Sequence, residues 1–359
     1  MTRVESVTAC AYTVPTETKE SDGTLEWDST TIVIVTASAG GETGIGWTYA
    51  PAAAAALVDE LLRHVVTGRD AFATGGAHLA MRAALRNAGY DGLGAAAVSA
   101  VDVALWDLKA RLLDVPLASL VGAVHDTVPV YGSGGFCSYS DEQLVAQLAG
   151  WRELGIPRVK MKVGREPERD LARVGLARDA VGEDCELYVD ANGAFTAKEA
   201  LRFAHLFAAF GVGWFEEPVS SLDVDGLRLV RERGPAGMDV AAGEYASTLA
   251  DFAHLVGVVD CLQADVTRCG GITGLLAAAA LAEASELELS GHTAPTIHAH
   301  ALCAVPKLRH LEWFHDHVRI ERRFFEGFLE PVDGVVRPDL SRPGLGVELR
   351  RPDTERWAA

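Results

Sequence analysis

Positive charge is scarce in this 359-residue chain, and this scarcity disfavours several kinds of partner. The chain has 32 lysines and arginines against 50 aspartates and glutamates, so its formal net charge is −18. Such an excess of negative charge argues against nucleic acid or an anionic membrane surface as the partner. A small anionic substrate stays possible, because a bound metal and a few lysines can reverse the potential locally.

Cysteines are few, and none of them forms a C-x-x-C pair. In a chain of this length their dispersion predicts buried, reduced thiols of a cytosolic protein. The first residues, MTRVESVTACAYTVP, lack the apolar core of a signal peptide, and the alanine runs at 52–56 and 277–280 are too short to span a bilayer. We therefore expect a cytoplasmic protein. The cysteines are Cys10, Cys137, Cys185, Cys261, Cys269 and Cys303.

Nucleotide-binding motifs are also missing, since no strand–helix turn carries G-x-G-x-x-G and there is no P-loop. From Asp126 onward, strand-like and helical segments alternate instead. The helices carry start signals, such as the capping-box pairs Ser140/Gln143 and Thr196/Glu199. Eight such repeats predict an α/β fold with a (β/α)₈ barrel rather than an open doubly wound sheet. The expected strands are TVPVYGSGG, PRVKMKVG, CELYVDAN, GWFEEP, DVAAGE, CLQADVT, LELSGH and HLEWF.

The remaining chain predicts two further parts beside a barrel over residues 126–320. Within residues 1–125, TTIVIVTASAGGETGIGWTY indicates two strands around a Gly-Gly turn, and long helical patterns follow, so we expect a separate α+β domain. The polar segment Thr16–Thr30 is expected to be an exposed loop. Residues 321–359 are extended in character and rich in proline and glycine, and we expect them to fold back onto the first domain.

Three carboxylates stand at the ends of successive strand-like segments: Asp190 in LYVDAN, Glu216 in WFEEP and Glu244 in VAAGE. They are 26 and 28 residues apart, about the length of one strand–loop–helix–loop unit. Because such barrels keep their active sites at the C-terminal ends of the strands, we expect the three side chains to converge. Three oxygen ligands in one place suit a divalent cation such as Mg²⁺.

Other charged or titratable residues fall at the remaining strand ends. Lys160 and Lys162 in VKMK precede Asp190 by one unit, and period-two alternation puts both on the same side of their strand. Three more groups follow Glu244 at intervals of 21, 27 and 20 residues: Asp265, His292 and Glu312.

These groups suit removal of a proton α to a carboxylate. The product is a dianionic enediolate, so a metal and cations must stabilise the charge as it develops. A lysine base has an ordinary pKa of ~10.4, and a second lysine and a cation nearby are expected to bring it toward ~7–8. A histidine held by an aspartate is the other usual base. Lys162 and His292 lie on predicted strands 2 and 7, so they could flank a substrate on opposite faces.

Simpler explanations exist for each residue alone. A single carboxylate at a strand end is more often a helix cap or a salt-bridge partner, Lys160 could be only a structural ion-pair partner, and His292 could be structural. Glu217 is expected to point away from the site, because it alternates with Glu216. Trp27 and Trp47 could contact the substrate or serve as packing anchors.

The two H-x-H pairs, His298/His300 and His315/His317, raise the alternative of a zinc site. Zinc-dependent barrel hydrolases resemble one another in carrying H-x-H on the first strand, which here is TVPVYGSGG. We therefore disfavour zinc and expect His298 and His300 at a helix start or at the rim of the site.

Taken together, VKMK, VDANG, WFEEP, AAGE, QADVTRCGGITG, SGH and HLEW, in this order, resemble the enolase superfamily, mandelate racemase subgroup. The helical text VDVALWDLKARLLDVPL is also similar to the helix before the barrel in that family, and the resemblance runs over nearly the whole chain. It implies a modified (β/α)₈ TIM barrel with an N-terminal α+β capping domain, and a symmetric homo-oligomer. It also implies an essential Mg²⁺ held by Asp190, Glu216 and Glu244.

The resemblance further implies roles for single residues. Lys162 would be one base, and His292 paired with Asp265 would be the second acid/base. Lys160 would help to bind and polarise the substrate carboxylate. The remaining implied contacts with the substrate are Glu312 at its carboxylate, Asn192, and the capping segments around Trp27 and Tyr49.

Two bases on opposite faces permit several reactions of a small-molecule carboxylate. We favour dehydration of an acid sugar to a 2-keto-3-deoxy acid, because the predicted capping loop is polar. The alternatives are a racemase or epimerase of a 2-hydroxy acid, a cycloisomerase of a sugar lactone or anhydro sugar acid, and a non-catalytic binding protein on the same fold. The charged loop residues are Glu17, Lys19, Glu20, Asp22, Glu26 and Asp28.

Overall fold

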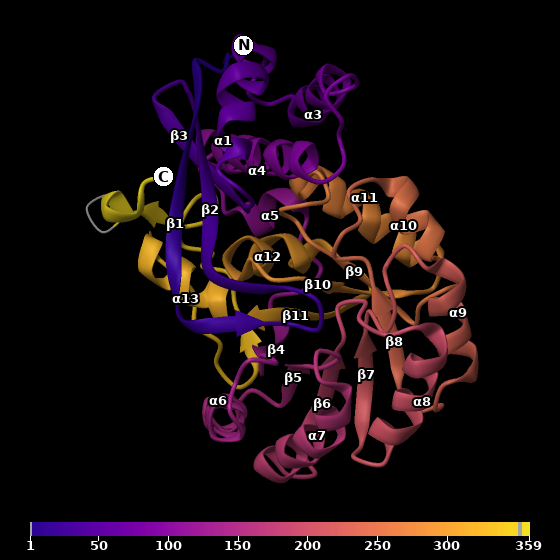
Figure 1. Ribbon diagram of the computed structural model, residues 1–359. Helices are drawn as coiled ribbons and strands as arrows, with labels where there is room; N and C mark the ends of the chain where they lie inside the picture. The colour runs from indigo at the N-terminus through magenta and orange to yellow at the C-terminus, as the bar shows by residue number, and fades with distance from the viewer. Residues whose placement is uncertain (1, 351–353) are drawn as a thin grey trace.

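A closed parallel barrel forms the larger part of the protein, as predicted (Figure 1). The computed structural model describes residues 2–350 and 354–359. Each strand from β4 to β11 pairs with the next, and β11 pairs in parallel with β4, which closes the ring. The strands are β4 (Val128–Gly134), β5 (Arg158–Lys162), β6 (Glu186–Asp190), β7 (Val212–Glu216), β8 (Asp239–Ala242), β9 (Cys261–Ala264), β10 (Glu288–Gly291) and β11 (Leu308–Phe314).

Helices follow the strands and cover the outside of the barrel. The predicted capping boxes are present at Ser140 and Thr196, each of whose side chains accepts a hydrogen bond from the backbone three residues on. Gly155 and Gly182 follow the ends of α6 and α7 at positive φ, which a glycine adopts without strain. The helices are α6 (Asp141–Glu153), α7 (Pro167–Val181), α8 (Ala197–Ala208), α9 (Val224–Arg233), α10 (Leu249–Leu255), α11 (Gly271–Ala284), α12 (Pro295–Ala301) with a 3₁₀ turn (Leu302–Ala304), and α13 (His315–Phe324).

An apolar cluster lies inside the barrel, and strand alternation places polar groups next to it. Tyr188 belongs to this cluster, so Asp190, two residues on, shares its side of β6. Trp214 and Glu216 repeat the pattern on β7, where the indole Nε1 donates to Glu216 Oε2 at 3.0 Å. The aromatic layer therefore lies next to a row of charged groups at the C-terminal ends of the strands.

An antiparallel sheet and five helices form the capping domain. The sheet has the order β1 (Ser6–Ser21), β2 (Glu26–Ala39) and β3 (Glu42–Tyr49), with Gly40 and Gly41 in the predicted turn. A Cβ at Gly44 or Gly46 would lie 2.3 Å from backbone atoms of α4, so both glycines let that helix pack directly on β3. The helices are α1 (Ala53–Leu57), a π-helical turn (Val58–Leu62), α2 (Arg63–Val66), α3 (Thr74–Ala84), α4 (Leu93–Leu112) and α5 (Leu117–Val121).

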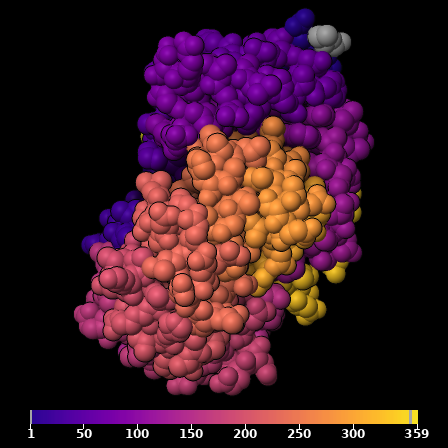
Figure 2. Space-filling model, turned by 90° about the vertical axis from the view of Figure 1, so that its right-hand side faces the viewer, coloured from indigo at the N-terminus to yellow at the C-terminus, as the bar shows by residue number. Residues whose placement is uncertain are grey.

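The segment Thr16–Thr30 is mostly paired strand rather than a loop, and only part of it is exposed as its polar composition predicts. It is the end of a long β1–β2 hairpin that reaches down beside the barrel (Figure 1). Figure 2 shows the capping domain above the barrel, with a separate region from the first residues lower down, beside the barrel. Glu20, Ser21 and Asp22 are buried because the hairpin packs against barrel loops. Composition identified a polar segment but could not reveal the surface that covers it.

The C-terminal segment joins the capping domain to the barrel. The predicted domain boundary at residue 320 falls inside α13, which continues to Phe324. Beyond it, β13 (Val335–Val336) pairs antiparallel with the start of β4. Asp107 on α4 accepts backbone hydrogen bonds from Leu345 and from Ile45, so one buried carboxylate holds both chain segments. The other short elements are β12 (Phe325–Glu326), β14 (Glu348–Leu349) and a 3₁₀ turn (Glu355–Trp357).

All six cysteines are free, and four of them are buried. The prediction of burial was wrong for Cys10, which is exposed on β1, and Cys137 is only partly buried. Within the described ranges, no helix has the length and apolar character needed to cross a membrane.

Candidate active site

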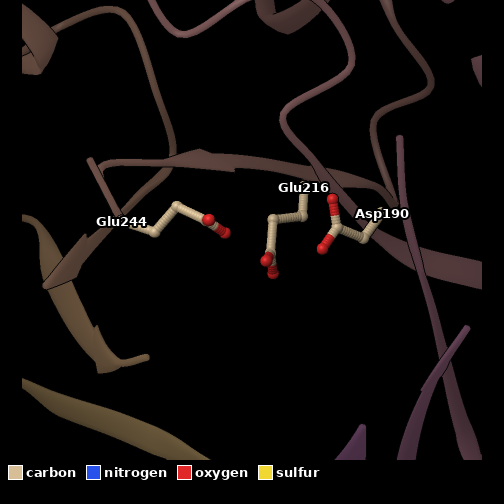
Figure 3. A group of neighbouring side chains, drawn as sticks. All are labelled: Asp190, Glu216 and Glu244. Carbon is tan, nitrogen blue, oxygen red and sulfur yellow. The ribbon is translucent and has the colours of Figure 1, made fainter. Parts of the chain in front are cut away.

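The three predicted carboxylates meet at one end of the barrel. Asp190 and Glu216 are the last residues of β6 and β7, and Glu244 follows β8. One oxygen of each lies within 4.8 Å of the others, and all three residues are buried. Figure 3 shows that the side chains come from separate parts of the barrel and turn their carboxylates toward a common space. In the described part of the chain, this is the one acidic or histidine cluster with the geometry to hold a metal ion.

Two buried lysines lie directly beside these carboxylates. Lys162 Nζ lies 2.6 Å from Asp190 Oδ2. Lys160 Nζ contacts Glu216 and lies 3.2 Å from Asp190 Oδ2 and 2.8 Å from Glu312 Oε1. The prediction that both lysines share one side of their strand is therefore confirmed by their common partner, Asp190.

The pKa of Lys162 differs from its predicted direction. Burial and Lys160 lower this pKa, as expected, but the adjacent Asp190 carboxylate outweighs them, so the pKa lies above its ordinary value. Asp190 is also a candidate metal ligand, so its attraction for the ammonium group weakens when it binds a cation. A sequence could not give the separation between Lys162 and Asp190 on which this balance depends.

The chemistry of the three carboxylates fits a divalent cation. Burial and the neighbouring Asp190 raise the pKa of Glu216 to about 8. Burial disfavours the ionised form of Glu216, and a cation bound nearby would favour it. Glu244 is 3% exposed, and its Oε2 accepts no hydrogen bond, although His292 Nε2 lies 3.3 Å away. A Mg²⁺ ion would supply positive charge beside Glu216 and a partner for this Glu244 oxygen.

The histidine on the opposite part of the ring has the predicted aspartate partner. His292 follows β10, and its Nδ1 lies 2.8 Å from Asp265 Oδ2. With that carboxylate accepting from Nδ1, the Nε2 atom faces the site, where Glu312 Oε2 lies 3.4 Å away. Burial lowers the pKa of His292, but Glu244, Glu312 and Asp265 together raise it above its ordinary value. Asp265 therefore holds His292 in one orientation, and the raised pKa favours the protonated ring.

A cavity of about 460 Å³ lies between this cluster and the capping domain. Lys162 and His292 both line it, on β5 and after β10, and at least two strands separate these positions around the ring. Trp47, in contrast, is fully buried and stacks on Phe325 at 4.3 Å, so the packing alternative holds for this tryptophan. Other predicted residues that line the cavity are Trp27, Tyr49, Asn192, Glu244 and Glu312.

The β1–β2 hairpin is fitted closely to the barrel end. Ser21 O accepts a hydrogen bond of 2.7 Å from Cys137 N, and Trp27 packs edge-on against Phe136. A Cβ placed on Gly23 would lie 2.3 Å from Ala191 O, directly after the strand that carries Asp190. The hairpin can therefore reach the cavity only because residue 23 has no side chain.

Gly23→Ala is expected to raise KM about tenfold and to leave the fold intact. The added methyl group must push the hairpin off the barrel, and overpacking of this kind costs about 1–3 kcal/mol. Steady-state kinetics and circular dichroism would measure the two effects. Gly75→Ala is the matched control, because nothing lies within 4 Å of a Cβ at that helical position. Equal kinetics in both variants would show that the hairpin does not shape the cavity.

Glu321 is a buried carboxylate that sequence reasoning missed, and it joins three parts of the site. Its Oε1 accepts from Trp47 Nε1 and from Tyr49 OH, both at 3.1 Å. Its Oε2 accepts from Thr296 N at 2.9 Å, at the start of the helix that follows His292. Burial raises the pKa of Glu321 to about 7, although these donors lower it.

Glu321→Gln is expected to remove a pH-dependent loss of stability. The folded-state pKa of about 7 exceeds the ordinary 4.5, so the folded state binds this proton more tightly. The stability that the protonated Glu321 contributes to the fold is complete below pH 4.5 and is lost as pH rises to 7. This loss changes the free energy of unfolding by about 3 kcal/mol. Urea unfolding at pH 5 and pH 8 would measure it. The exposed Glu283→Gln is the control, and parallel pH profiles for wild type and Glu321→Gln would contradict the assignment.

The histidine pairs and Glu217 lie outside the metal cluster. His298 is buried on α12, where Nδ1 lies 2.7 Å from Thr293 O and Nε2 accepts from Val266 N. Glu217 does not alternate as expected, because it follows the strand at a φ of +36°, and it is buried beside the cluster. Several further residues line the cavity, although the sequence analysis gave none of them a role in the site. They are Thr293, Arg268, Asp316 and His317.

Two family descriptions match the chain. Residues 6–122 match the N-terminal domain of the mandelate racemase / muconate lactonizing enzyme family. Residues 143–354 match the enolase C-terminal domain-like family. The first matched range covers most of the capping domain, and the second covers the barrel after β4 together with most of the C-terminal segment.

Curated relatives act on sugar acids, according to their names. The 3,6-anhydro-alpha-L-galactonate cycloisomerase of Streptomyces coelicolor is 35% identical over 357 residues, covering 96% of this chain and 97% of that protein. The L-talarate/galactarate dehydratase of Salmonella typhimurium is 33% identical over 278 residues, covering 75% of this chain and 67% of that protein.

Solved structures superpose over nearly the whole chain. A mandelate racemase/muconate lactonizing enzyme-like protein from Rubrobacter xylanophilus has a TM-score of 0.98 and 56% identity, covering 99% of this chain and 100% of that one. A racemase from Streptomyces coelicolor A3(2) with bound magnesium has a TM-score of 0.93 and 33% identity over the same shares. The predicted resemblance is confirmed: the chain belongs to the mandelate racemase / muconate lactonizing enzyme family of the enolase superfamily.

Proposed function

We propose that this protein is a Mg²⁺-dependent acid-sugar dehydratase, which removes the proton α to a carboxylate and yields a 2-keto-3-deoxy acid. One observation carries the proposal: Glu244 of the carboxylate cluster and two separate proton-transfer groups, Lys162 and His292, line the same cavity. Relatives that act on sugar acids support the substrate class.

Mg²⁺ held by Asp190, Glu216 and Glu244 would stabilise the negative charge that develops on the substrate carboxylate. Lys160 adds a fixed positive charge beside this site, because burial lowers its pKa less than the three surrounding carboxylates raise it. Glu312, whose Oε1 also accepts from Ser133 Oγ at 2.5 Å, is held where it can contact the substrate carboxylate. These groups are in place before reaction, so little reorganisation is needed as charge develops.

Lys162 takes the α-proton in this proposal. Its ammonium group must first lose its own proton, which becomes easier when Asp190 shares its charge with a cation. His292, protonated at Nε2 and oriented by Asp265, gives a proton to the departing β-hydroxyl group. Water leaves, and the enol product rearranges to the keto acid.

A cycloisomerase is the second candidate, and the 35% identity to an anhydrogalactonate cycloisomerase over 96% of this chain favours it. The same two groups serve this reaction, because an internal ring oxygen leaves in place of water. A racemase differs again, since His292 would return a proton to the α-carbon instead of to an oxygen.

Proton NMR in D₂O separates these reactions. The protein with Mg²⁺ is incubated with mono- and diacid sugars, anhydro sugar acids and 2-hydroxy acids. We expect a new methylene signal and loss of the α and β protons of one acid sugar. Turnover of an anhydro sugar acid alone would indicate the cycloisomerase, and loss of the α signal alone would indicate a racemase or epimerase. No change in any compound would contradict catalysis of this class.

A further inference from the structure

One arginine contacts both halves of the candidate active site. Arg268 comes three residues after Asp265, beyond the end of β9, and it lines the cavity. Its Nη1 lies 3.3 Å from Glu244 Oε1, which belongs to the metal cluster. Its Nε lies 3.3 Å from Asp265 Oδ2, which belongs to the histidine pair. Because a guanidinium group is planar and rigid, these contacts link the two carboxylates through a single inflexible unit.

Glu244 depends on such a support, because it lies beyond its strand. Ala242 is the last residue of β8, and Gly243 follows with a φ of +133°. Arg268 Nη1 donates to the main-chain O of Glu244 at 3.4 Å and to its Oε1 at 3.3 Å. The other carboxylate oxygen, Oε2, is buried and accepts no hydrogen bond from the residues that the structure describes. The arginine therefore engages one oxygen of Glu244 and leaves the other free for a cation.

The two oxygens of Asp265 also have separate partners. Oδ1 accepts from the backbone N and from the Oγ1 of Thr267, both at 2.7 Å. Oδ2 lies 2.8 Å from His292 Nδ1 and 3.3 Å from Arg268 Nε. The oxygen that orients the histidine ring is therefore the one that Arg268 contacts. A shift of the guanidinium group would change the orientation of His292 through this shared atom.

Packing holds the arginine as well as charge. Its guanidinium group lies over the ring of Tyr245, at 5.1 Å from the centroid. The preceding residue, Thr267, accepts a hydrogen bond of 2.8 Å at its main-chain O from Thr48 Oγ1 of β3, which ties this loop to the capping domain. The Arg268 side chain is still 29% exposed, so a small solute in the cavity can reach it.

We propose that Arg268 is a positioning residue, which sets the placement of the metal ligand Glu244 relative to the acid/base pair of His292 and Asp265. The effect on His292 rests on the proposed function, whereas the effect on Glu244 requires only that the carboxylate cluster binds Mg²⁺. A lysine at this position would keep the charge. It would offer one nitrogen in place of the guanidinium fork, so it could not hold both carboxylates in the same arrangement.

Arg268→Lys tests the effect on Glu244 without any substrate. Because the variant keeps the positive charge, a change in Mg²⁺ affinity reports the lost guanidinium geometry. We expect calorimetric titration to give a Mg²⁺ dissociation constant about tenfold above that of wild type, as is usual when a residue that orients a metal ligand is changed. Arg202→Lys, exposed on α8, is the matched control and should bind Mg²⁺ as wild type does. Equal affinity in Arg268→Lys and wild type would overturn the inference, whatever the substrate is.

Kinetics at saturating Mg²⁺, with the acid that wild type turns over, test the effect on His292. We expect Arg268→Lys to lower kcat by about 10–100-fold and to change KM by less than about threefold. A higher KM with an unchanged kcat would show that Arg268 binds the substrate, and would overturn the positioning role. In Arg268→Ala, added guanidinium should restore part of kcat and methylammonium should not, and equal rescue by both would overturn the role of the planar fork. A wild type that turns over no acid would contradict the proposed function, while the Mg²⁺ titration would still decide the effect on Glu244.

Discussion

Replacing Lys162 by alanine is expected to lower kcat by about 10²–10⁴-fold, the usual contribution of a general base. The variant loses the ammonium group that lines the cavity, while the three carboxylates of the metal cluster remain. Removing a positive charge beside Asp190 cannot weaken cation binding electrostatically, so Mg²⁺ affinity should be equal or higher. Steady-state kinetics and Mg²⁺ calorimetry would measure the two effects.

The exposed Lys198→Ala is the matched control for the loss of a lysine, and its turnover should equal that of wild type. A Lys162→Ala variant with full turnover would show that another group removes the proton. A variant that loses Mg²⁺ together with activity would assign Lys162 a structural role instead.

Replacing Glu216 by glutamine is expected to abolish turnover, with a loss of at least about 10⁴-fold at Mg²⁺ concentrations that saturate wild type. The change removes one ligand charge at the centre of the cluster. It should also remove the stabilisation by Mg²⁺, which for wild type is about 2.7 kcal/mol at 100 times the dissociation constant. Kinetics and thermal unfolding with and without Mg²⁺ would measure both losses.

Glu283→Gln, an exposed change of the same type on α11, should leave both readouts unchanged. Chelation of Mg²⁺ from wild type should stop turnover reversibly. Full activity in the presence of chelator, or an undiminished stabilisation of Glu216→Gln by Mg²⁺, would contradict the assignment of the metal cluster.

Repetition along the chain made the barrel and its carboxylates predictable. A strand followed by a helix returns to the same barrel end once per unit, so intervals of 26 and 28 residues were enough to bring Asp190, Glu216 and Glu244 together. Alternation within β5 likewise placed Lys160 and Lys162 on one side. These inferences depend on regular backbone geometry, which local sequence determines well.

Contacts between segments far apart in the sequence were not predictable in this way. The hairpin was expected to be an exposed loop because it is polar. Its partial burial depends on Gly23 fitting against Ala191 O, and no local pattern reveals that fit. Glu321 was missed for the same reason, since its partners lie on β3 and α12. The direction of the Lys162 pKa also depended on a distance to Asp190 that only the folded chain fixes.

The separate roles of Lys162 and His292 are tested most directly in the Mg²⁺-loaded His292→Asn variant. Proton NMR in D₂O follows the exchange of the substrate α-proton. This variant keeps Lys162 but cannot protonate the departing hydroxyl group. We predict that it exchanges the α-proton of the acid sugar that wild type dehydrates, while product formation falls by about 10²-fold or more. Lys162→Ala should show neither exchange nor product with the same compound. Product formation by His292→Asn at the wild-type rate, or α-exchange that survives in Lys162→Ala but not in His292→Asn, would contradict the account.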